Sequence, residues 1–174
     1  PETLAVQHEG VRLMVMGTVK RGGSGCVCPE NVLLRSLVRH LLLERDDVVI
    51  LDMVAGIEHL GRATADAVDA FLVVVEPGMR SVQTARTIRR LAVDIGIHRV
   101  YAVANKVRTD EERAFVEQEM ADFTLLGIIG YHPEVVEADR RGVALYDLGG
   151  KALEEIRAIQ RRLDRMLTQE RGTT

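Results

Sequence analysis

The sequence has few lysines, few cysteines and no long apolar run, and each shortage argues against a class of protein. Only Lys20, Lys106 and Lys151 are lysines among 23 basic residues, and the formal net charge is −3. The other 20 basic residues are arginines spread along the chain among acidic neighbours, a compositional bias rather than a binding patch, so the sequence predicts no nucleic-acid partner. No run approaches the roughly 18 apolar residues of a membrane span, and no signal-peptide pattern opens the chain. We expect a cytoplasmic protein, where two cysteines are more commonly free thiols or metal ligands than a disulfide.

The chain also contains no P-loop motif. That motif, G-x-x-x-x-G-K-[ST], uses glycines to free backbone N–H groups for phosphates, a lysine for the β and γ phosphates and a hydroxyl for Mg²⁺. The glycine-rich stretch 20–25 imitates it, but Cys26 follows Gly25, and no lysine precedes a serine or threonine anywhere. We therefore reject this stretch as a P-loop.

Short apolar runs alternate with longer amphipathic stretches. The pattern predicts strands at Val11–Met16, Val48–Leu51, Phe71–Val75, Val100–Ala104 and Leu125–Ile129. It predicts helices from Pro29, over 81–94, over 109–120 with Thr109 as the cap, over 133–141, and from about Gly150 to Thr168. This alternation indicates an α/β fold, with a mostly parallel sheet covered by helices on both faces. We expect one domain over residues 1–174, with a disordered tail at 170–174.

Asp52 directly follows the apolar run Val48–Leu51, which has the pattern of a strand buried on both faces. Ligands of open α/β sheets bind beyond the carboxyl ends of the strands, so Asp52 is a candidate ligand of Mg²⁺. Gly56, four residues later, could approach a terminal phosphate closely because it has no Cβ. The alternative is that Asp52 only caps the next helix.

Cys26 and Cys28 are separated by one residue in a glycine-flanked loop. Two thiolates fill only two positions of a tetrahedral metal site, and the same pair from a second chain would complete it. Soft thiolates favour zinc, copper(I) or nickel. The alternatives are two ordinary cysteines or a strained, redox-active disulfide.

Asn105 and Lys106 lie at the end of a predicted strand and resemble the Asn-Lys-x-Asp base-recognition element of GTPases, with Arg108 in place of the aspartate. An asparagine amide can pair with the N6 and N7 edge of adenine, so we expect adenine rather than guanine. Pro133, after His132 at the next strand end, would lie near the same base. The alternative is an asparagine that only caps a strand end.

Together these stretches resemble a known family. The segments that carry the resemblance are Gly25-Cys26-Val27-Cys28-Pro29-Glu30-Asn31, the run from Asp52 to Arg62, Val74-Val75-Glu76-Pro77 with Ser81 and Thr84, and Asn105-Lys106-Val107. They are similar to the CooC-type maturation ATPases of nickel carbon monoxide dehydrogenase, in the MinD/ParA group of P-loop NTPases. The resemblance covers nearly the whole chain.

The resemblance implies a homodimeric accessory ATPase for nickel insertion into carbon monoxide dehydrogenase. By analogy, Asp52 would bind Mg²⁺, Gly56 would sense the γ-phosphate, and Asn105, Lys106 and Pro133 would hold ATP or ADP. Cys26 and Cys28 would share Ni²⁺ or Zn²⁺ between two protomers. Hydrolysis would then switch the dimer between two arrangements.

One departure from the family is large. The family carries its P-loop on a first strand that this sequence does not include, so we expect the chain alone to bind nucleotide poorly and not to hydrolyse ATP. Two alternatives stay open: a metal-binding dimeric module without catalysis, and a MinD/ParA-like positioning ATPase. The last predicted helix has an apolar stripe beside arginines, but acidic residues interrupt its positive face, so membrane binding is not expected.

Overall fold

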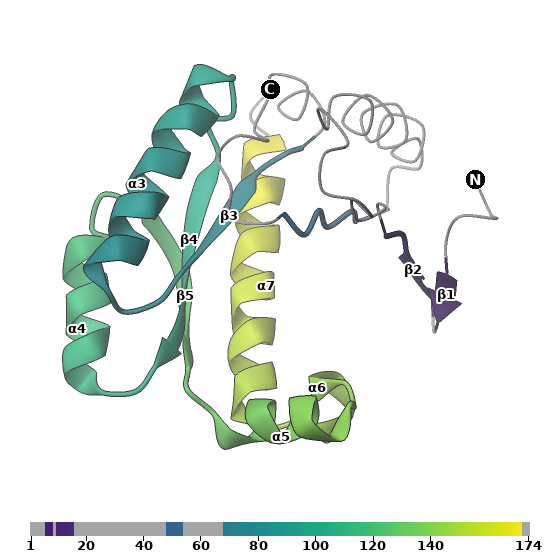
Figure 1. Cartoon of the computed structure of the whole chain (residues 1–174). Coiled ribbons are helices and arrows are strands. Elements are labelled where there is room, and N and C mark those ends of the chain that lie inside the picture. Colours follow the sequence, from purple (N-terminus) through teal and green to yellow (C-terminus); the bar gives the residue numbers. More distant parts are fainter. Residues whose placement is uncertain (1–5, 9, 16–47, 54–67, 172–174) are drawn as a thin grey trace, which may run out of the picture. The chain divides into compact units, whose positions relative to one another are not determined.

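The structure is a computed structural model that describes residues 6–8, 10–15, 48–53 and 68–171 (Figure 1). These residues fall into two compact units, Pro1–Asp52 and Met53–Thr174, and each is described by itself. The helix expected from Pro29 lies outside the described residues.

The first unit contains a small antiparallel hairpin. Strand β1 (Val6–His8) pairs with β2 (Val11–Leu13), with Val6 opposite Leu13 and His8 opposite Val11. Gly10 has a φ of 82°, a left-handed conformation that glycine adopts without strain and that suits a tight turn. The predicted strand Val11–Met16 is therefore shorter than expected, and its partner is antiparallel rather than parallel.

The prediction of a strand at Val48–Leu51 is wrong. Residues 48–53 have no secondary structure, and the side chains of Val48 and Ile50 are both 86% exposed rather than buried. An apolar run becomes a strand only when a neighbouring strand pairs with its backbone, and none of the described strands pairs with this one. Asp52 consequently follows a segment with which no described strand pairs, and not the end of a strand.

A three-stranded parallel sheet forms the centre of the second unit. Its strands are β3 (Phe71–Val75), β4 (Val100–Val107) and β5 (Thr124–Gly130), in the spatial order β3-β4-β5. Val75 lies opposite Ala104, and Val107 lies opposite Gly130. These are three of the predicted strands, with β4 and β5 longer than the apolar runs that predicted them.

Helices cover both faces of this sheet, as predicted (Figure 1). Helices α3 (Met79–Asp94) and α4 (Asp110–Glu119) pack on one face, where Val82, Ala85, Ala92 and Val116 are fully buried. Helix α7 (Lys151–Arg171) packs on the other face through Ile159, against Tyr101, Val103 and Leu126. Apolar side chains at helical spacing account for both contacts.

Two shorter helices follow β5. Helix α5 (Pro133–Arg141) begins with proline, whose fixed φ suits the first turn, and ends at Gly142 in the left-handed conformation. Helix α6 (Leu145–Leu148) is too short to show a periodic pattern, so the sequence did not predict it. The last helix extends to Arg171, two residues into the segment 170–174 that was expected to be disordered, and residues 172–174 lie outside the description.

Among the described residues, no helix or loop covers the outer face of β3. Val73 and Val75 point into the core, whereas Leu72 and Val74 are 47% and 59% exposed. Within the described residues β3 is also an edge strand, because only β4 pairs with it. In the described part of the chain, no helix is both long enough and apolar enough to cross a bilayer.

Candidate functional site

Polar residues gather at the carboxyl edge of the parallel sheet. Glu76 follows β3, Asn105 and Lys106 lie near the end of β4, and His132 and Pro133 follow β5. Because the strands are parallel, their carboxyl ends share one edge, which is where ligands bind in open α/β sheets. The structure therefore places Asn105, Lys106 and Pro133 at one edge of the sheet.

The end of β4 has an irregular backbone that turns Lys106 toward β3. The pairing of β4 with β5 shifts in register between Ala104 and Val107, and Lys106 has a φ of 58°, the only positive value among the described non-glycine residues. Its ammonium Nζ lies 2.6 Å from Glu76 Oε1. Such strained residues cluster at functional sites, so this geometry supports a binding role for the edge.

The ion pair between Lys106 and Glu76 orients side chains more than it stabilises the fold. Both side chains are more than half exposed, at 54% and 57%, and an ion pair of that exposure contributes about 0–1 kcal/mol. The backbone N–H of Glu76 also donates to the Ser81 hydroxyl at 3.1 Å, which fixes the turn before α3. The pair thus connects the ends of two neighbouring strands.

Asn105 is half-buried, and its amide N–H₂ group has no acceptor among the described residues. Its Oδ1 accepts a hydrogen bond from the Lys106 backbone N–H at 2.9 Å. A purine N7 accepts such a donor, and Oδ1 keeps a second lone pair for the N6 amino group of adenine. The amide thus fits an adenine base.

The end of β5 is tied to the end of β4. The Tyr131 N–H donates to the Val107 carbonyl at 2.8 Å, and the Arg108 guanidinium lies over the Tyr131 ring, 4.9 Å from its centroid. Arg108, the residue that departs from the GTPase pattern, therefore packs against an aromatic ring. This contact fixes the segment between the last strand and Pro133.

A part-buried polar cluster closes this end of the sheet. His132 Nε2 lies 2.8 Å from Glu155 Oε2, and the same oxygen accepts the Gly130 N–H at 2.9 Å. Glu134 lies on the other side of the ring, with its Oε1 3.9 Å from His132 Nδ1. The cluster joins the end of β5 to the starts of α5 and α7.

Glu134 also caps helix α7. Its carboxylate accepts the Ala152 N–H at 3.4 Å, satisfying a backbone donor in the first turn. The hydrogen bond from its own backbone N–H lowers the pKa of the Glu134 carboxyl, helped by the bond from Ala152 and opposed by desolvation. Glu134 therefore stays ionised near neutral pH, as a cap requires.

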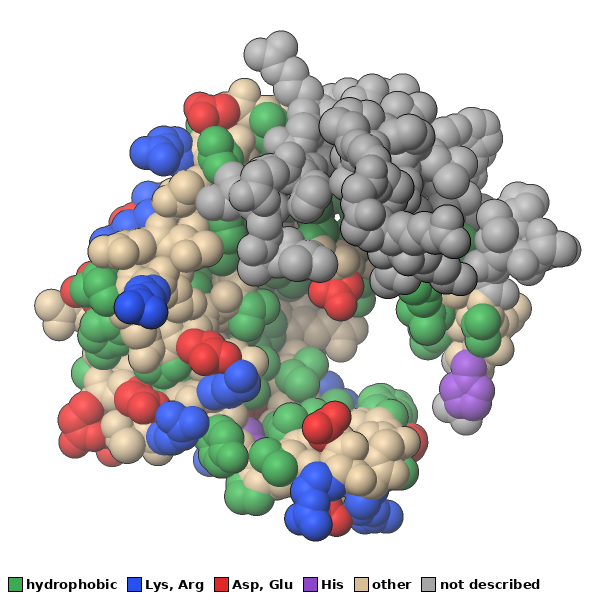
Figure 2. Space-filling model, in the orientation of Figure 1, with side chains coloured by type: hydrophobic (Ala, Val, Ile, Leu, Met, Phe, Trp, Pro, Cys, Tyr) green, Lys and Arg blue, Asp and Glu red, His purple; other side chains and the backbone are tan. Residues whose placement is uncertain are grey.

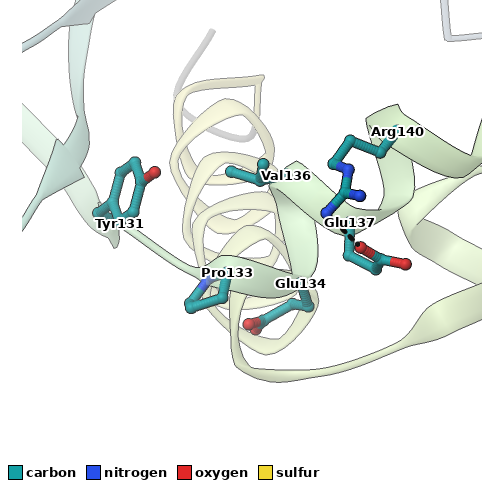
Figure 3. Close-up of a pocket in the computed structure, with 6 residues that line it drawn as sticks. All are labelled: Tyr131, Pro133, Glu134, Val136, Glu137 and Arg140. Atoms are coloured by element: carbon teal, nitrogen blue, oxygen red, sulfur yellow. Dashed lines mark ion pairs between the residues drawn. The ribbon is translucent and has the colours of Figure 1, made fainter.

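An open hollow of about 450 Å³ lies beside this cluster (Figure 3). Tyr131 borders it from the strand end, and the remaining lining residues come from the start and outer turns of α5: Pro133, Glu134, Val136, Glu137 and Arg140. Arg140 and Glu137, three residues apart on α5, form an ion pair of 3.6 Å on its side of the hollow. On the face seen in Figure 2, basic and acidic side chains are interspersed over the second unit.

The other predicted site residues are not assembled by the described structure. Asp52 is exposed and lies in the first unit, so it is not placed relative to the sheet edge. Cys26, Cys28 and Gly56 lie outside the described residues. Among the residues that are described, no group of three His, Cys, Asp or Glu side chains could hold a metal ion.

Sequence reasoning missed two members of the site, Glu76 and Glu155. Glu76 had a usable signal, because it directly follows an apolar strand, as Asp52 was expected to do. Glu155 had none, because it lies 25 residues from Gly130 on an amphipathic helix whose polar residues all look alike in sequence. Only the docking of α7 brings it to the strand end.

Comparison with known proteins gives two close relatives by sequence. The chain is 44% identical to the carbon monoxide dehydrogenase accessory protein CooC of Rhodospirillum rubrum, over 91% of the chain and 60% of that protein. It is 46% identical to an uncharacterized ATP-binding protein of Methanocaldococcus jannaschii, over 86% of the chain and 58% of that protein. The chain thus spans about 60% of the length of these curated relatives, and no protein-family model matches it.

Comparison with solved structures identifies the fold. The MinD cell division protein of Aquifex aeolicus superposes with a TM-score of 0.51 at 24% identity, covering 59% of this chain and 46% of MinD. The MinC:MinD complex of the same organism gives the same score. The chain therefore has a MinD-like α/β fold and, over most of its length, resembles the CooC-type accessory proteins of the MinD/ParA group of P-loop NTPases.

Proposed function

We propose that this chain is part of an ATP-binding accessory protein that serves carbon monoxide dehydrogenase. The observation that supports this most strongly is the 44% identity to CooC over 91% of the chain. The carboxyl edge of the sheet adds a physical reason, because a half-buried asparagine amide stands there beside a lysine in a strained conformation. In this proposal Asn105, Lys106 and Pro133 hold the adenine nucleotide.

Asp52 and Gly56 complete the nucleotide site in this proposal. A carboxylate binds Mg²⁺ directly or through water, and a glycine N–H can approach a terminal phosphate. The exposed carboxylate of Asp52 suits an oxygen-preferring cation. The Mg²⁺ ion would neutralise phosphate charge, and the residues of this chain would bind and orient the nucleotide.

Nickel delivery is the second part of the proposal. Cys26 and Cys28 from two protomers would form a four-sulfur site that takes Ni²⁺ or Zn²⁺ across a two-fold axis. Nucleotide-dependent contacts of the Asp52 loop would switch the dimer between two arrangements, and the metal loop would follow that change. As the sequence predicts, this function belongs in the cytoplasm.

Metal stoichiometry tests the proposal. Anaerobically purified chain is loaded with Ni²⁺ or Zn²⁺, and bound metal per chain is measured together with the mass in solution. We expect about half a metal ion per chain in a dimer, lost in Cys26→Ser and in Cys28→Ser. A monomer without metal, or a Cys28→Ser variant that still dimerises around metal, would contradict the shared site.

Repeating the measurement with ATP added separates the proposal from a metal-binding module without nucleotide chemistry. Such a module would bind metal identically, but ATP would change neither its mass in solution nor its metal retention. A positioning ATPase whose last helix binds a membrane has less support, because the apolar side chains of α7 pack against the sheet: Ile159, Leu163, Met166 and Leu167.

A further inference from the structure

We infer that Glu155 and His132 are positioning residues for base recognition, and that they set the preference for adenine at the end of β5. They do so by fixing the backbone of residues 130–133, which ends in the proposed base contact Pro133. This inference rests on the proposed nucleotide function and adds to it a support that lies on a different helix.

The Glu155 carboxylate is hydrogen-bonded to two groups at the end of β5. A single carboxylate oxygen, Oε2, accepts both the Gly130 N–H at 2.9 Å and the His132 Nε2–H at 2.8 Å. Hydrogen bonds to an ionised acceptor are roughly twice as strong as neutral ones. Two such bonds from neighbouring residues fix the chain between them, and Pro133 is the next residue.

The side chains that form these hydrogen bonds are largely buried, so losing one of the bonds is costly. The side chains of His132 and Glu155 are only 12% and 21% exposed, so water cannot easily replace the bonds. The groups that face the imidazole are Glu155 from α7 and Glu134 from α5. Removing either partner of the 2.8 Å contact leaves a part-buried polar group without its bond, which favours movement of the loop.

Gly130 shows how closely this loop is packed. A Cβ on this residue would lie 2.9 Å from His132 Nε2 and 3.0 Å from His132 Cε1. The imidazole is therefore pressed against the backbone of the strand that it follows. A ring held this closely transmits the position of Glu155 to residues 131–133.

Position matters because base selection depends on geometry. An amide that pairs with adenine discriminates only when the base lies at the correct depth, and a displacement of about 0.5 Å or more weakens such a site. Pro133 would limit that depth from β5, while Asn105 reads the base edge from β4. Loosening the β5 side should reduce the preference for adenine more than it reduces purine binding in general.

The test measures adenosine and guanosine binding to the chain by NMR titration. The reporters are the Asn105 side-chain amide and the backbone amides of Tyr131 and His132. The unsubstituted chain should prefer adenosine, and we expect Glu155→Ala and His132→Ala to reduce that preference about fivefold to tenfold, the effect of one lost hydrogen bond. Glu155→Gln and His132→Gln keep an acceptor and an N–H donor respectively, so they should restore most of it.

Arg162→Ala is the matched control. Arg162 Nη1 donates to the Leu126 carbonyl at 3.3 Å, so it also joins α7 to β5, but at the middle of the strand rather than at its end. Its removal should lower the melting temperature without changing the adenosine-to-guanosine ratio. A purely structural role for Glu155 would give that same result.

The outcomes separate the inference from the function on which it rests. If Glu155→Ala and His132→Ala lower the melting temperature but keep the ratio of the unsubstituted chain, the inference is wrong and the proposed base site stands. If the unsubstituted chain shows no shift at Asn105 with either nucleoside, the base site itself is wrong and the inference falls with it.

Discussion

The side-chain hydroxyl of Thr109 caps helix α4 and fixes the connection from β4 to α4. Thr109 Oγ1 accepts the Glu112 N–H at 3.2 Å, and the Glu112 carboxylate accepts the Arg108 N–H at 2.6 Å. The sequence predicted this cap from Thr109 and from Glu112 three residues later, and the structure confirms it. The hydroxyl also hydrogen-bonds to the Glu111 carboxylate, which lowers the pKa of that carboxyl.

Thr109→Ala should destabilise the chain by about 1 kcal/mol, because a backbone donor in the first turn of α4 loses its acceptor. Urea unfolding measures the change. Thr87→Ala is the control, since the Thr87 hydroxyl donates to the Gln83 carbonyl within α3 and caps no helix, and it should cost less than about 0.5 kcal/mol. Equal losses in the two variants would contradict the capping role.

The cost of Thr109→Ala should also depend on pH. The pKa of folded Glu111 is depressed below 4.5, so its stabilising contribution is complete above the unfolded pKa and is lost as the pH falls through the folded pKa. The difference in unfolding free energy between the two proteins should therefore shrink on going from neutral pH to about pH 3. Carboxyl NMR of Glu111 should show its pKa rising in the variant.

At the scale of elements, helix α7 packs so closely on β5 at Gly127 that there is no room for a side chain there. A Cβ built on Gly127 would lie 2.5 Å from Ile159 Cγ1 and 3.2 Å from Ile159 Cδ1. Ile159 is 9% exposed and forms the centre of the core on the α7 face of the sheet. Gly127 is thus a glycine because the helix approaches the strand closely, and its φ is not positive.

Gly127→Ala should destabilise the chain by about 1–3 kcal/mol, the usual cost of overpacking. Ile159→Ala alone should cost about 2–5 kcal/mol through the cavity that it leaves. If the Cβ clash is the cause, the two changes should be far from additive, because alanine at 159 removes the atoms that the new methyl group meets. Additive losses in the double-mutant cycle would show that Gly127 matters for another reason.

The accuracy of sequence-based prediction varied by element for a physical reason. Helix α3 and strand β3 were predicted well, because apolar periodicity and the stop at Glu76-Pro77-Gly78 are local signals. Val48–Leu51 has an equally apolar pattern but lacks a pairing strand among the described residues, and pairing is not local. The contact of Glu155 with His132 is non-local too. The sequence therefore indicated Pro133 at the end of β5 but not Glu155, the α7 residue that holds this strand end in place.

For the whole molecule, the exposed outer face of β3 has a consequence for handling the protein. Leu72 and Val74 are exposed on a strand that reads Phe-Leu-Val-Val-Val, with no charge and no proline, and that is an edge strand among the described residues. Such an edge can pair with the same edge of another molecule and extend into a cross-β aggregate. Concentrated solutions of this chain should therefore form thioflavin-positive aggregates during storage.

Leu72→Lys should slow that aggregation several-fold, because a charge on an edge strand opposes edge-to-edge pairing. Gln83→Lys adds the same charge on the exposed surface of α3 and should leave the lag time unchanged. We therefore expect the exposed strand to limit the concentration at which the binding experiments can be run, and the lysine variant to be the more soluble form for them.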